Sequence, residues 1–300
     1  MDRLEAMSML VKISEMGSFS AASRALKVPL ATLSRRISDL EALLGARLLI
    51  RTTRKLTLTD AGTAYVAAAR RILEQVEDAE REASGEFSVP KGELVITAPL
   101  MFGRLYLLPV VAEFLAQYSQ IKIRLQLSDR NTDLIDEQVD MALRIGTLAD
   151  SSMVATPVGG MRTVCCASPA FLAAHGIPRS ANDLLRFPCI TVDTPMPSPA
   201  WRFGAAGTRR DIPVEPRLSV TTPEAVAQAA ILGVGIARLL HYQVAAAVAR
   251  QELQIVLEDC EPLPSPVNLV HPSRGRMPLK MRCFLDFAVP RLREALSRLS

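Results

Sequence analysis

Side chains in the first 45 positions repeat with the period of an α-helix and are interrupted at turn-forming residues. One predicted face of the first segment consists of Leu4, Met7, Val11 and Ser14. Asp2 can cap this helix and Gly17 can end it, so we expect a helix over residues 2–16. A second helix is expected from Ser20, as its cap, to Leu26.

The third predicted helix, Leu30–Leu44, follows a turn at Lys27–Pro29 and stops at Gly45. Two helices joined by so short a turn form a helix-turn-helix. The apolar face of the third helix is Leu33, Ile37, Leu40 and Leu44. Its opposite face carries Ala31, Ser34, Arg35 and Ser38. Because small residues let a helix lie deep in the major groove and arginine can read guanine, this face indicates DNA recognition; an ordinary amphipathic helix is the alternative.

Basic residues precede an alternating pattern in residues 51–59. Arg51, Arg54 and Lys55 place three cations in five residues, and apolar residues then alternate with threonine. This pattern predicts a short two-stranded wing with a basic tip. A charge run is commonly a solvated surface, but directly after a helix-turn-helix we favour phosphate binding, because phosphate contacts fix the register on the duplex.

The net charge of +4 supports this placement. Residues 1–60 hold 10 Lys or Arg and 6 Asp or Glu, whereas the other 240 residues hold 25 of each. A local basic excess is what neutralisation of DNA phosphates requires. The chain of 300 residues, with 49% hydrophobic and 22% charged residues, is typical of two or three soluble domains.

A long amphipathic helix is expected over residues 60–84, with Thr59 as its cap. Its seam consists of Ala61, Tyr65, Ala68, Ile72, Val76, Ala79 and Ala83. We interpret the seam as a contact with the same helix of a second copy; packing on its own globular domain is the alternative. Glycine, serine and proline mark residues 84–92 as a linker.

Strands and helices alternate beyond the linker, which predicts open α/β sheets. The first set comprises strands at Leu94–Thr97, Ile121–Leu127 and Met141–Ile145, with helices at Arg104–Tyr118 and Leu134–Glu137. The second set comprises strands at 163–167, 201–203, 217–220 and 234–237, with helices at 169–174 and 223–232. A strand at Val267–His271 and a helix at Lys280–Leu299 complete the pattern.

The five cysteines form no C-x-x-C pair, which argues against a disulfide framework or a zinc site. We interpret them as small buried hydrophobic residues, with a redox-sensing thiol as the alternative. No run of about 18 uninterrupted apolar residues occurs, and the start Met1–Glu5 lacks an apolar signal core. We therefore expect a cytoplasmic protein without a membrane span.

The sequence resembles the LysR-type transcriptional regulators over essentially its whole length. In the first domain the resemblance rests on Gly17–Ala22, Leu26, Ser34-Arg35, Ile37, Leu40-Glu41, Leu44-Gly45, Leu48-Leu49, Arg51 and Leu56–Gly62. In the remainder it rests on Asp140–Gly146, Ala229–Ala237, His271-Pro272, Pro278–Lys280 and Phe284.

The resemblance implies an N-terminal all-α winged helix-turn-helix (1–59), a dimerisation helix and hinge (60–90) and an α/β effector domain like a periplasmic binding protein. Effector subdomain I would comprise residues 91–163 and 267–300, and subdomain II residues 164–266. The chain would cross between them near 162–164 and 264–268. A small effector would bind between the subdomains. The partners implied are double-stranded promoter DNA, the effector, further copies of the chain in a tetramer, and RNA polymerase.

Two sets of site residues follow from these interpretations. The predicted DNA-binding residues are Leu30, Thr32, Ser34, Arg35, Arg36, Ser38, Arg51, Arg54 and Lys55. The predicted effector-binding residues are Pro99, Leu100, Met101, Phe102, Ser128, Arg130, Arg144, Thr221 and Thr222. Two helix N-termini, at 99–103 and 222–223, suit a carboxylate, and apolar side chains at 100–102 favour a partly apolar acid. Arg144 has an alternative interpretation as the partner of a nearby acid.

The chain departs from the family pattern at three places. Leu30 stands where relatives often have a glutamine, a residue that can contact adenine, so a thymine methyl is the expected partner. Pro99 stands where relatives often have a hydroxyl, and Thr221–Pro223 replaces an Asn-Asp pair. Thr222 can still cap the helix predicted at 223–232, and Pro223 suits the first position of that helix.

Two rival functions fit less well. A Rossmann-like enzyme would use Gly233–Arg238, but the third glycine is missing and the segment follows a helix. His175, His241 and His271 lack metal-ligand spacing, and no G-x-S-x-G occurs. A free solute-binding protein leaves the first 90 residues unexplained. We therefore expect no catalytic activity, no cofactor and no metal.

Overall fold

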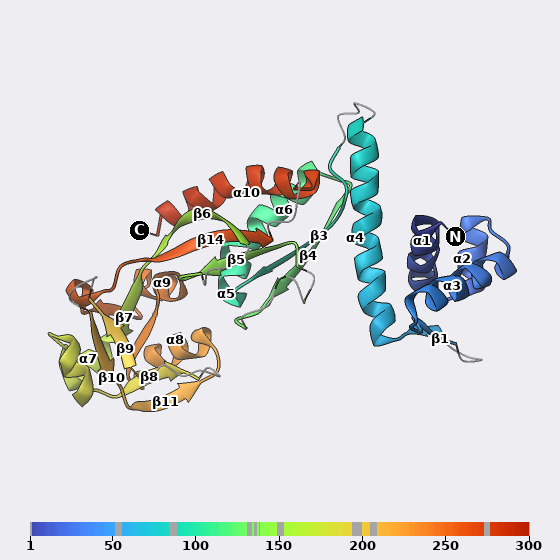
Figure 1. The fold of residues 1–300 in the computed structure, drawn as a ribbon. Coiled ribbons are helices and arrows are strands. Elements are labelled where there is room, and N and C mark those ends of the chain that lie inside the picture. The colour runs from blue at the N-terminus through green and yellow to red at the C-terminus, as the bar shows by residue number, and fades with distance from the viewer. Residues whose placement is uncertain are drawn as a thin grey trace. The chain divides into compact units, whose positions relative to one another are not determined.

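The structure is a computed structural model of the chain. It describes residues 2–51, 56–83, 89–130, 134, 137, 139–148, 153–193, 200–204, 209–272 and 277–299; the side chains of 51, 78 and 81–83 lie outside the description. The chain divides into two compact units, Met1–Gly92 and Glu93–Ser300. Figure 1 shows the elements of each unit.

The first unit contains the predicted helix-turn-helix and wing. Its elements are α1 (Arg3–Met16), α2 (Phe19–Leu26), α3 (Leu30–Leu44), β1 (Leu49–Arg51), β2 (Leu56–Leu58) and α4 (Asp60–Ala83). Asp2 caps α1 by accepting from the N–H groups of Leu4 and Glu5, as predicted, and Gly17 ends it in the left-handed conformation. The cap of α2 is Ser18 and not Ser20, because the Ser18 side chain accepts from Ala21 N.

Two expectations about buried faces in this unit are wrong. The buried residues of α1 are Ala6, Met9, Leu10 and Ile13. The predicted face of Leu4, Met7, Val11 and Ser14 is exposed or only partly buried. Apolar residues occur all around α1, so its spacing alone does not select a face; the contacts with α2, α3 and α4 do. Leu44, expected in the core of α3, is 39% exposed.

The second unit holds two five-stranded sheets. The first has the order β4-β3-β5-β14-β6, built from β3 (Gly92–Ala98), β4 (Ile121–Leu127), β5 (Met141–Ile145), β6 (Met153–Met161) and β14 (Ser265–Pro272). The second has the order β11-β8-β12-β7-β13, built from β7 (Thr163–Ala167), β8 (Cys189–Val192), β11 (Pro216–Val220), β12 (Ile236–Leu240) and β13 (Gln254–Val256). The chain passes between the sheets at Arg162 and again before Ser265.

Shorter elements complete the second sheet. They are α7 (Pro169–His175), η2 (Ala181–Arg186), α8 (Pro223–Ile231), α9 (His241–Ala249), η3 (Glu258–Cys260) and a hairpin of β9 (Ala200–Phe203) with β10 (Arg210–Pro213). The spacing did not predict β6, β8, β10, β13 or α9. The helix expected at Leu134–Glu137 lies largely outside the described residues, and Leu134 and Glu137 themselves are in turns.

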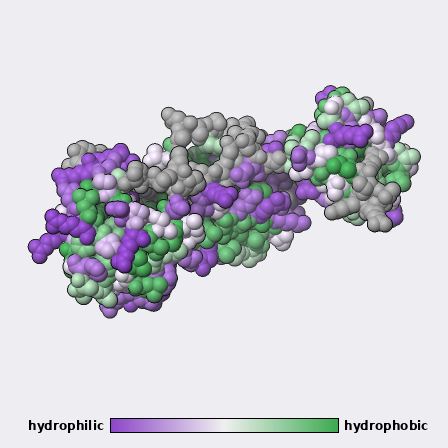
Figure 2. Space-filling model, turned by 90° about the horizontal axis from the view of Figure 1, so that it is seen from below, coloured by the Kyte–Doolittle hydropathy of each residue, from purple (hydrophilic) through white to green (hydrophobic). Residues whose placement is uncertain are grey.

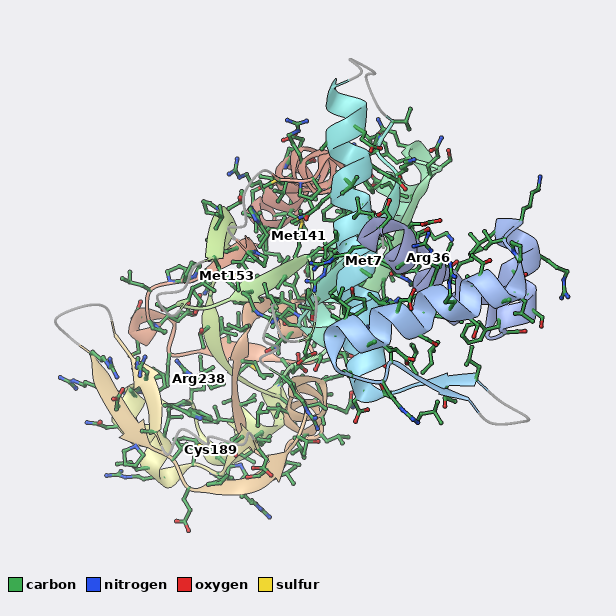
Figure 3. The ribbon with its side chains drawn as sticks, turned by 45° about the vertical axis from the view of Figure 1, so that its right-hand side comes forward. Met7, Arg36, Met141, Met153, Cys189 and Arg238 are labelled. Carbon is green, nitrogen blue, oxygen red and sulfur yellow. The ribbon has the colours of Figure 1, made fainter. Side chains whose placement is uncertain are left out.

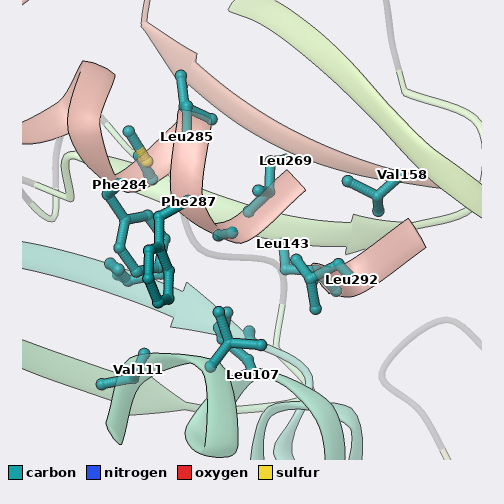
Figure 4. Packing of buried hydrophobic residues seen from close by; sticks show 14 of the residues in the cluster. Leu107, Val111, Leu143, Val158, Leu269, Phe284, Leu285, Phe287 and Leu292 are labelled. Atoms are coloured by element: carbon teal, nitrogen blue, oxygen red, sulfur yellow. The ribbon is translucent and has the colours of Figure 1, made fainter. Parts of the chain in front are cut away.

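Three helical segments follow β3 without a break: α5 (Leu100–Phe102), the π-helical η1 (Gly103–Leu107) and α6 (Leu108–Gln117). Together with α10 (Leu279–Ser297) they cover one face of the first sheet, and Figure 4 shows Leu107, Phe284 and Leu292 in that core. Gly103 permits the close approach, because an added Cβ would lie 2.2 Å from Leu127 Cδ2.

The helical segment Leu100–Gln117 is long and apolar enough to cross a membrane by length and composition alone. In the structure, 33% of this segment is buried. Its inner side chains, Phe102, Leu107, Val110, Val111 and Phe114, belong to the core of the first sheet. Leu100, Leu105 and Leu108 are 41%, 41% and 46% exposed. Hydrophobic atoms are visible on the surface of this unit in Figure 2.

Candidate DNA-binding surface and effector site

The predicted recognition face lies on the outer side of α3. Arg35 and Ser38 are exposed, and Leu30 is 46% exposed at the start of the helix. Thr32 and Ser34 are partly buried beside them. Leu33, Ile37 and Leu40 pack in the opposite direction with no exposed surface, which fixes the rotation of the helix.

Arg36 does not belong to this face. Its guanidinium lies 3.5 Å from the Glu5 carboxylate of α1, and Figure 3 shows it on the side of α3 that faces α1. Arg36 is only 29% exposed, and its Nε is buried without a hydrogen-bond partner. Arg36 therefore lies on another side of α3 than Arg35, because one residue further along a helix turns a side chain by about 100°.

The wing is held to α3 by a carboxylate. Glu41 Oε1 accepts hydrogen bonds from Leu48 N (2.7 Å) and Leu49 N (3.1 Å), which directs the chain into β1. The strands β1 and β2 pair antiparallel, with Arg51 opposite Leu56. Arg54 and Lys55, and the side chain of Arg51, lie outside the described residues.

Gly62 and Thr59 fix the start of α4 against the wing. Thr59 Oγ1 accepts from Gly62 N at 2.8 Å, which confirms the predicted cap, and donates to Arg47 O at 2.7 Å. Gly62 lies so close to the chain at Leu48 that an added Cβ would be 1.9 Å from the carbonyl oxygen of Leu48. A side chain at position 62 would therefore collide with backbone.

The long helix α4 contacts its own domain along one face. Val66 and Ala69 are buried there, and Arg70 lies 3.5 Å from Glu15 of α1. The residues of this face, Val66 and Ala69, do not belong to the predicted seam. The neighbouring seam stays accessible: Ile72 is 38% exposed, Ala79 is exposed, and Tyr65, Ala68 and Val76 are partly buried.

In the second unit, the loop after β4 occupies the N-terminus of α5. The Leu100 N–H donates to Asp129 Oδ1 at 3.0 Å, and Ser128 Oγ accepts from Arg130 N at 3.2 Å. Pro99 has no N–H to donate. The first donor of this helix is therefore already used by a carboxylate of the protein, which corrects the expectation that an anionic effector would find it free.

The segment after Pro99 and the segment at Thr222 are linked by an ion pair. Thr222 Oγ1 accepts from Ala225 N at 3.3 Å and caps α8 as predicted, and Thr221 beside it is exposed. Arg104 Nη2 lies 3.1 Å from Glu224 Oε1 in the first turn of α8. The structure thus connects two of the predicted effector-binding segments, one from each sheet.

Aromatic packing lies between the same two parts of the unit. The Phe102 ring is 4.9 Å from the Tyr106 ring and 5.2 Å from that of Tyr242 in α9. Phe102 has no exposed surface, so the prediction that its side chain forms an apolar rim is wrong. Of the neighbouring residues Leu100 is exposed and Met101 partly buried. Burial raises the pKa of Tyr242 to about 12, so its hydroxyl stays neutral.

Arg144 lies at the end of β5, opposite Asn268 of β14. Burial lowers the pKa of its guanidinium, and the charge of Glu137 acts in the opposite direction. The alternative that Arg144 interacts with a nearby acid is therefore supported. Sequence reasoning missed Asn268 and Thr97, two buried polar residues of the same sheet; a signal was available in the position of each within an otherwise apolar strand.

Family models match both units. Residues 4–63 match the bacterial regulatory helix-turn-helix protein of the lysR family, and residues 88–293 match the LysR substrate binding domain. The chain belongs to the LysR family of transcriptional regulators. It is a DNA-binding regulator with a domain that binds an effector, as its sequence pattern predicted.

Individual LysR-type regulators are similar over nearly the whole chain. An HTH-type transcriptional repressor of Pseudomonas aeruginosa is 32% identical, with coverage of 96% of this chain and 92% of the relative. The regulator CrgA of Neisseria meningitidis is 33% identical over 96% of each chain, and its solved structure superimposes with a TM-score of 0.61 over 96% of this chain and 98% of that chain. The full-length virulence activator AphB of Vibrio cholerae is 27% identical, with a TM-score of 0.60 over 96% and 99%.

The cysteines of this LysR-type regulator are shielded to different degrees. Cys165, Cys166 and Cys189 are buried, whereas Cys260 and Cys283 are partly exposed. Burial raises the pKa of Cys166 to about 12 and of Cys189 to about 11, and it raises that of Cys165 further. The thiolate is the reactive form, so burial opposes the redox-sensing alternative for these three. Among the described residues no group of three side chains could hold a metal ion.

We expect only Cys260 and Cys283 to react with a thiol reagent in the folded regulator, and all five to react after unfolding in denaturant. Mass spectrometry after alkylation at about pH 8 measures this. The raised pKa values favour protonated thiols in the folded state. Below pH 9.0, the ordinary pKa of a cysteine, the buried protonated thiols contribute fully to the free energy of unfolding. This contribution is lost as the pH rises towards about 11 for Cys189 and about 12 for Cys166. Rapid native labelling of Cys189 would contradict the expectation.

Proposed function

We propose that this regulator reads promoter DNA with the outer face of α3. The observation that carries the proposal is the exposure of Arg35 and Ser38 on the side opposite the buried Leu33, Ile37 and Leu40. Arginine can donate two hydrogen bonds to guanine, and the exposed Leu30 can contact a thymine methyl. Thr32 and Ser34 would contribute next to them, and Arg51, Arg54 and Lys55 would bind phosphates.

Replacing Arg35 by alanine should lower affinity for the operator by about 1–3 kcal/mol and relax specificity at one base pair, with little change on random DNA. Operator sites selected from random duplexes with the wild-type chain provide the probe, and fluorescence anisotropy at several salt concentrations provides the affinities. Arg36→Ala is the matched control, because Arg36 pairs with Glu5: it should retain sequence preference. Equal losses on specific and random DNA for Arg35→Ala would refute base reading.

We infer that two copies pair through the seam of α4 and that two such dimers join through their effector domains. The seam contains apolar side chains that the chain itself leaves accessible, above all Ile72. The outer side of the helix 100–117, with Leu105 and Leu108 exposed, supports a second contact. Paired DNA-binding domains suit operators whose half-sites repeat at about 34–36 Å.

We further propose that a small, partly apolar organic acid binds between the two subdomains, within reach of Ser128, Arg130, Arg144, Thr221 and Thr222. The ion pair between Arg104 and Glu224 supports the site, because it links the two predicted sides. Exposed ion pairs contribute only about 0–1 kcal/mol, so this link leaves the subdomains able to respond to a ligand. A coupling of about 1–3 kcal/mol between effector and DNA suffices to switch promoter occupancy.

We propose that the chain acts as a cytoplasmic regulator without catalytic activity, and that RNA polymerase is its further partner at the promoter. The supporting observation is that the described histidines lie apart in α7, α9 and β14, and that Nδ1 of each ring lies within hydrogen-bond distance of a backbone carbonyl oxygen. The proposed domain boundaries are 1–59 for the winged helix-turn-helix and 60–90 for the dimerisation helix and hinge. Effector subdomain I comprises 91–163 with 267–300, and subdomain II comprises 164–266.

A further inference from the structure

The chain crosses between the two sheets of the second unit along two connections of unequal length. In the first sheet β6 and β14 are neighbours, with Met161 opposite Ser265 (Figure 1), and in the second sheet β7 and β13 are neighbours. Residues 162–164 alone separate these two pairings on the first crossing, whereas residues 257–264 separate them on the second. The short crossing therefore acts as the pivot between the sheets, and the longer crossing has more conformational freedom of its own.

Arg162 fastens the long crossing to the short one. Its Nε donates to Glu261 Oε2 at 2.9 Å and its Nη2 donates to Glu261 Oε1 at 2.8 Å, so the guanidinium holds both carboxylate oxygens. A second acid of the long crossing, Glu258, accepts from the same Nη2 at 3.1 Å. Pairing at two points fixes the orientation of the two groups as well as their distance. Arg162, Glu258 and Glu261, called here the crossing clamp, thus join the two crossings in one defined arrangement.

The crossing clamp is less exposed to water than the other link between the two sheets. The side chains of Arg162 and Glu261 are 31% and 14% exposed, whereas those of Arg104 and Glu224 are 53% and 58% exposed. The hydrogen bonds with Glu261 are the largest cause that raises the pKa of the Arg162 guanidinium. Because water and salt screen a partly buried pair less than an exposed one, the clamp is the stronger of the two links.

The backbone on both sides of the clamp is anchored to neighbouring elements. The carbonyl oxygen of Arg162 accepts from His241 N at 2.9 Å, and that of Cys260 accepts from Gly204 N at 2.9 Å. Nδ1 of the same histidine lies 2.9 Å from the carbonyl oxygen of Leu299, just beyond the end of α10, which covers the first sheet. Elements of both sheets therefore meet at the short crossing, where a rotation between the sheets would be centred.

We propose that the crossing clamp is a hinge lock, which limits rotation between the two subdomains of the effector domain. With the clamp closed, the two crossings move as one element. With the clamp open, the long crossing changes its path independently, and the sheets reorient about the short crossing. The proposal rests on the proposed effector function, because the clamp sets how much of the effector's differential binding free energy a change in domain shape requires.

Pulsed electron paramagnetic resonance on the full chain measures this restraint. Lys122 of β4 and Arg217 of β11, both exposed, are each replaced by a keto amino acid that carries a spin label, so that the cysteines stay native. Labelled chains are diluted with unlabelled ones, so that distances within one chain dominate. We expect a narrow distance distribution with the clamp intact and a broader, shifted one for Arg162→Met. Amide exchange in residues 257–264 should also become about tenfold faster in this variant.

Two further variants separate a hinge lock from general destabilisation. Arg162→Met leaves the Glu261 charge unpaired, which destabilises by itself. Arg162→Met combined with Glu261→Met removes that charge, so it should recover melting temperature while it keeps the broad distribution. Arg250→Met is the matched control, because it breaks an Arg–Glu pair of 2.8 Å with Glu252 that lies away from the crossings. It should leave the distance distribution and the exchange of residues 257–264 unchanged.

Three results would overturn the hinge lock. They are a broad distribution in the protein with the intact clamp, an unchanged distribution in the double variant, and a broadening by Arg250→Met as large as that by Arg162→Met. All distances are measured without effector or DNA, so they do not depend on the proposed function. Failure of that function would appear separately, as loss of specific operator binding by the wild type.

Discussion

Replacement of Gly62 by alanine is expected to unfold or severely destabilise the DNA-binding domain and to abolish specific DNA binding. The new Cβ would lie 1.9 Å from the Leu48 carbonyl oxygen, which also accepts the hydrogen bond of Thr59 N. Backbone cannot rotate away as a side chain can, so we expect the upper end of the overpacking cost or more, about 3 kcal/mol. Melting followed by circular dichroism, together with operator affinity, measures both effects.

Gly45→Ala is the matched control for this expectation. Gly45 ends α3 at a φ of 64° and an added Cβ would meet no atom within 4 Å, so its cost is limited to the backbone conformation, about 1–2 kcal/mol. If Gly62→Ala were no more harmful than Gly45→Ala, the contact between α4 and the wing would not be as close as described.

Placing glutamate at both Ala68 and Ile72 should convert the regulator to a monomer and weaken operator binding by about 100-fold or more. Both residues lie in the seam of α4, where four added charges would meet across the proposed dimer contact and pay a large desolvation cost. A monomer also loses the gain in affinity from binding two half-sites together. Sedimentation equilibrium and operator titration report the two consequences.

The control variant is Thr63→Glu with Ala67→Glu, which adds the same charge at the same spacing on the side of α4 away from the seam. It should remain associated and bind the operator at nearly wild-type affinity. A double seam variant that sediments as the wild type does would exclude α4 as the dimer contact.

The effector half shows how tertiary contacts change the chemistry inferred for a helix end. By its sequence the segment at 99–103 offered a free helix N-terminus for an acid, yet Asp129, 29 residues away, accepts from Leu100 N. The aromatic side chain of Phe102 is likewise withdrawn into the core, against Tyr242 of α9.

Local sequence determined the elements whose ends are set by neighbouring residues. Asp2 and Gly17 bound α1, Gly45 ends α3, and Thr59 starts α4, because each cap bonds only to residues a few positions away. The strands β4, β5 and β7 also have the bounds that their composition predicted, and with the basic excess in residues 1–60 they indicated a DNA-binding regulator with an α/β effector domain.

The tertiary structure decided what depends on distant residues. Contact with α2, α3 and α4 chose the buried face of α1, and the fold placed Arg36 of α3 beside Glu5 of α1. The position of β14 between β5 and β6 brought Asn268 beside Arg144, 124 residues earlier in the chain. Periodicity along a segment carries no information on which strand will pair with it, so these polar neighbours became visible only once the sheet was assembled.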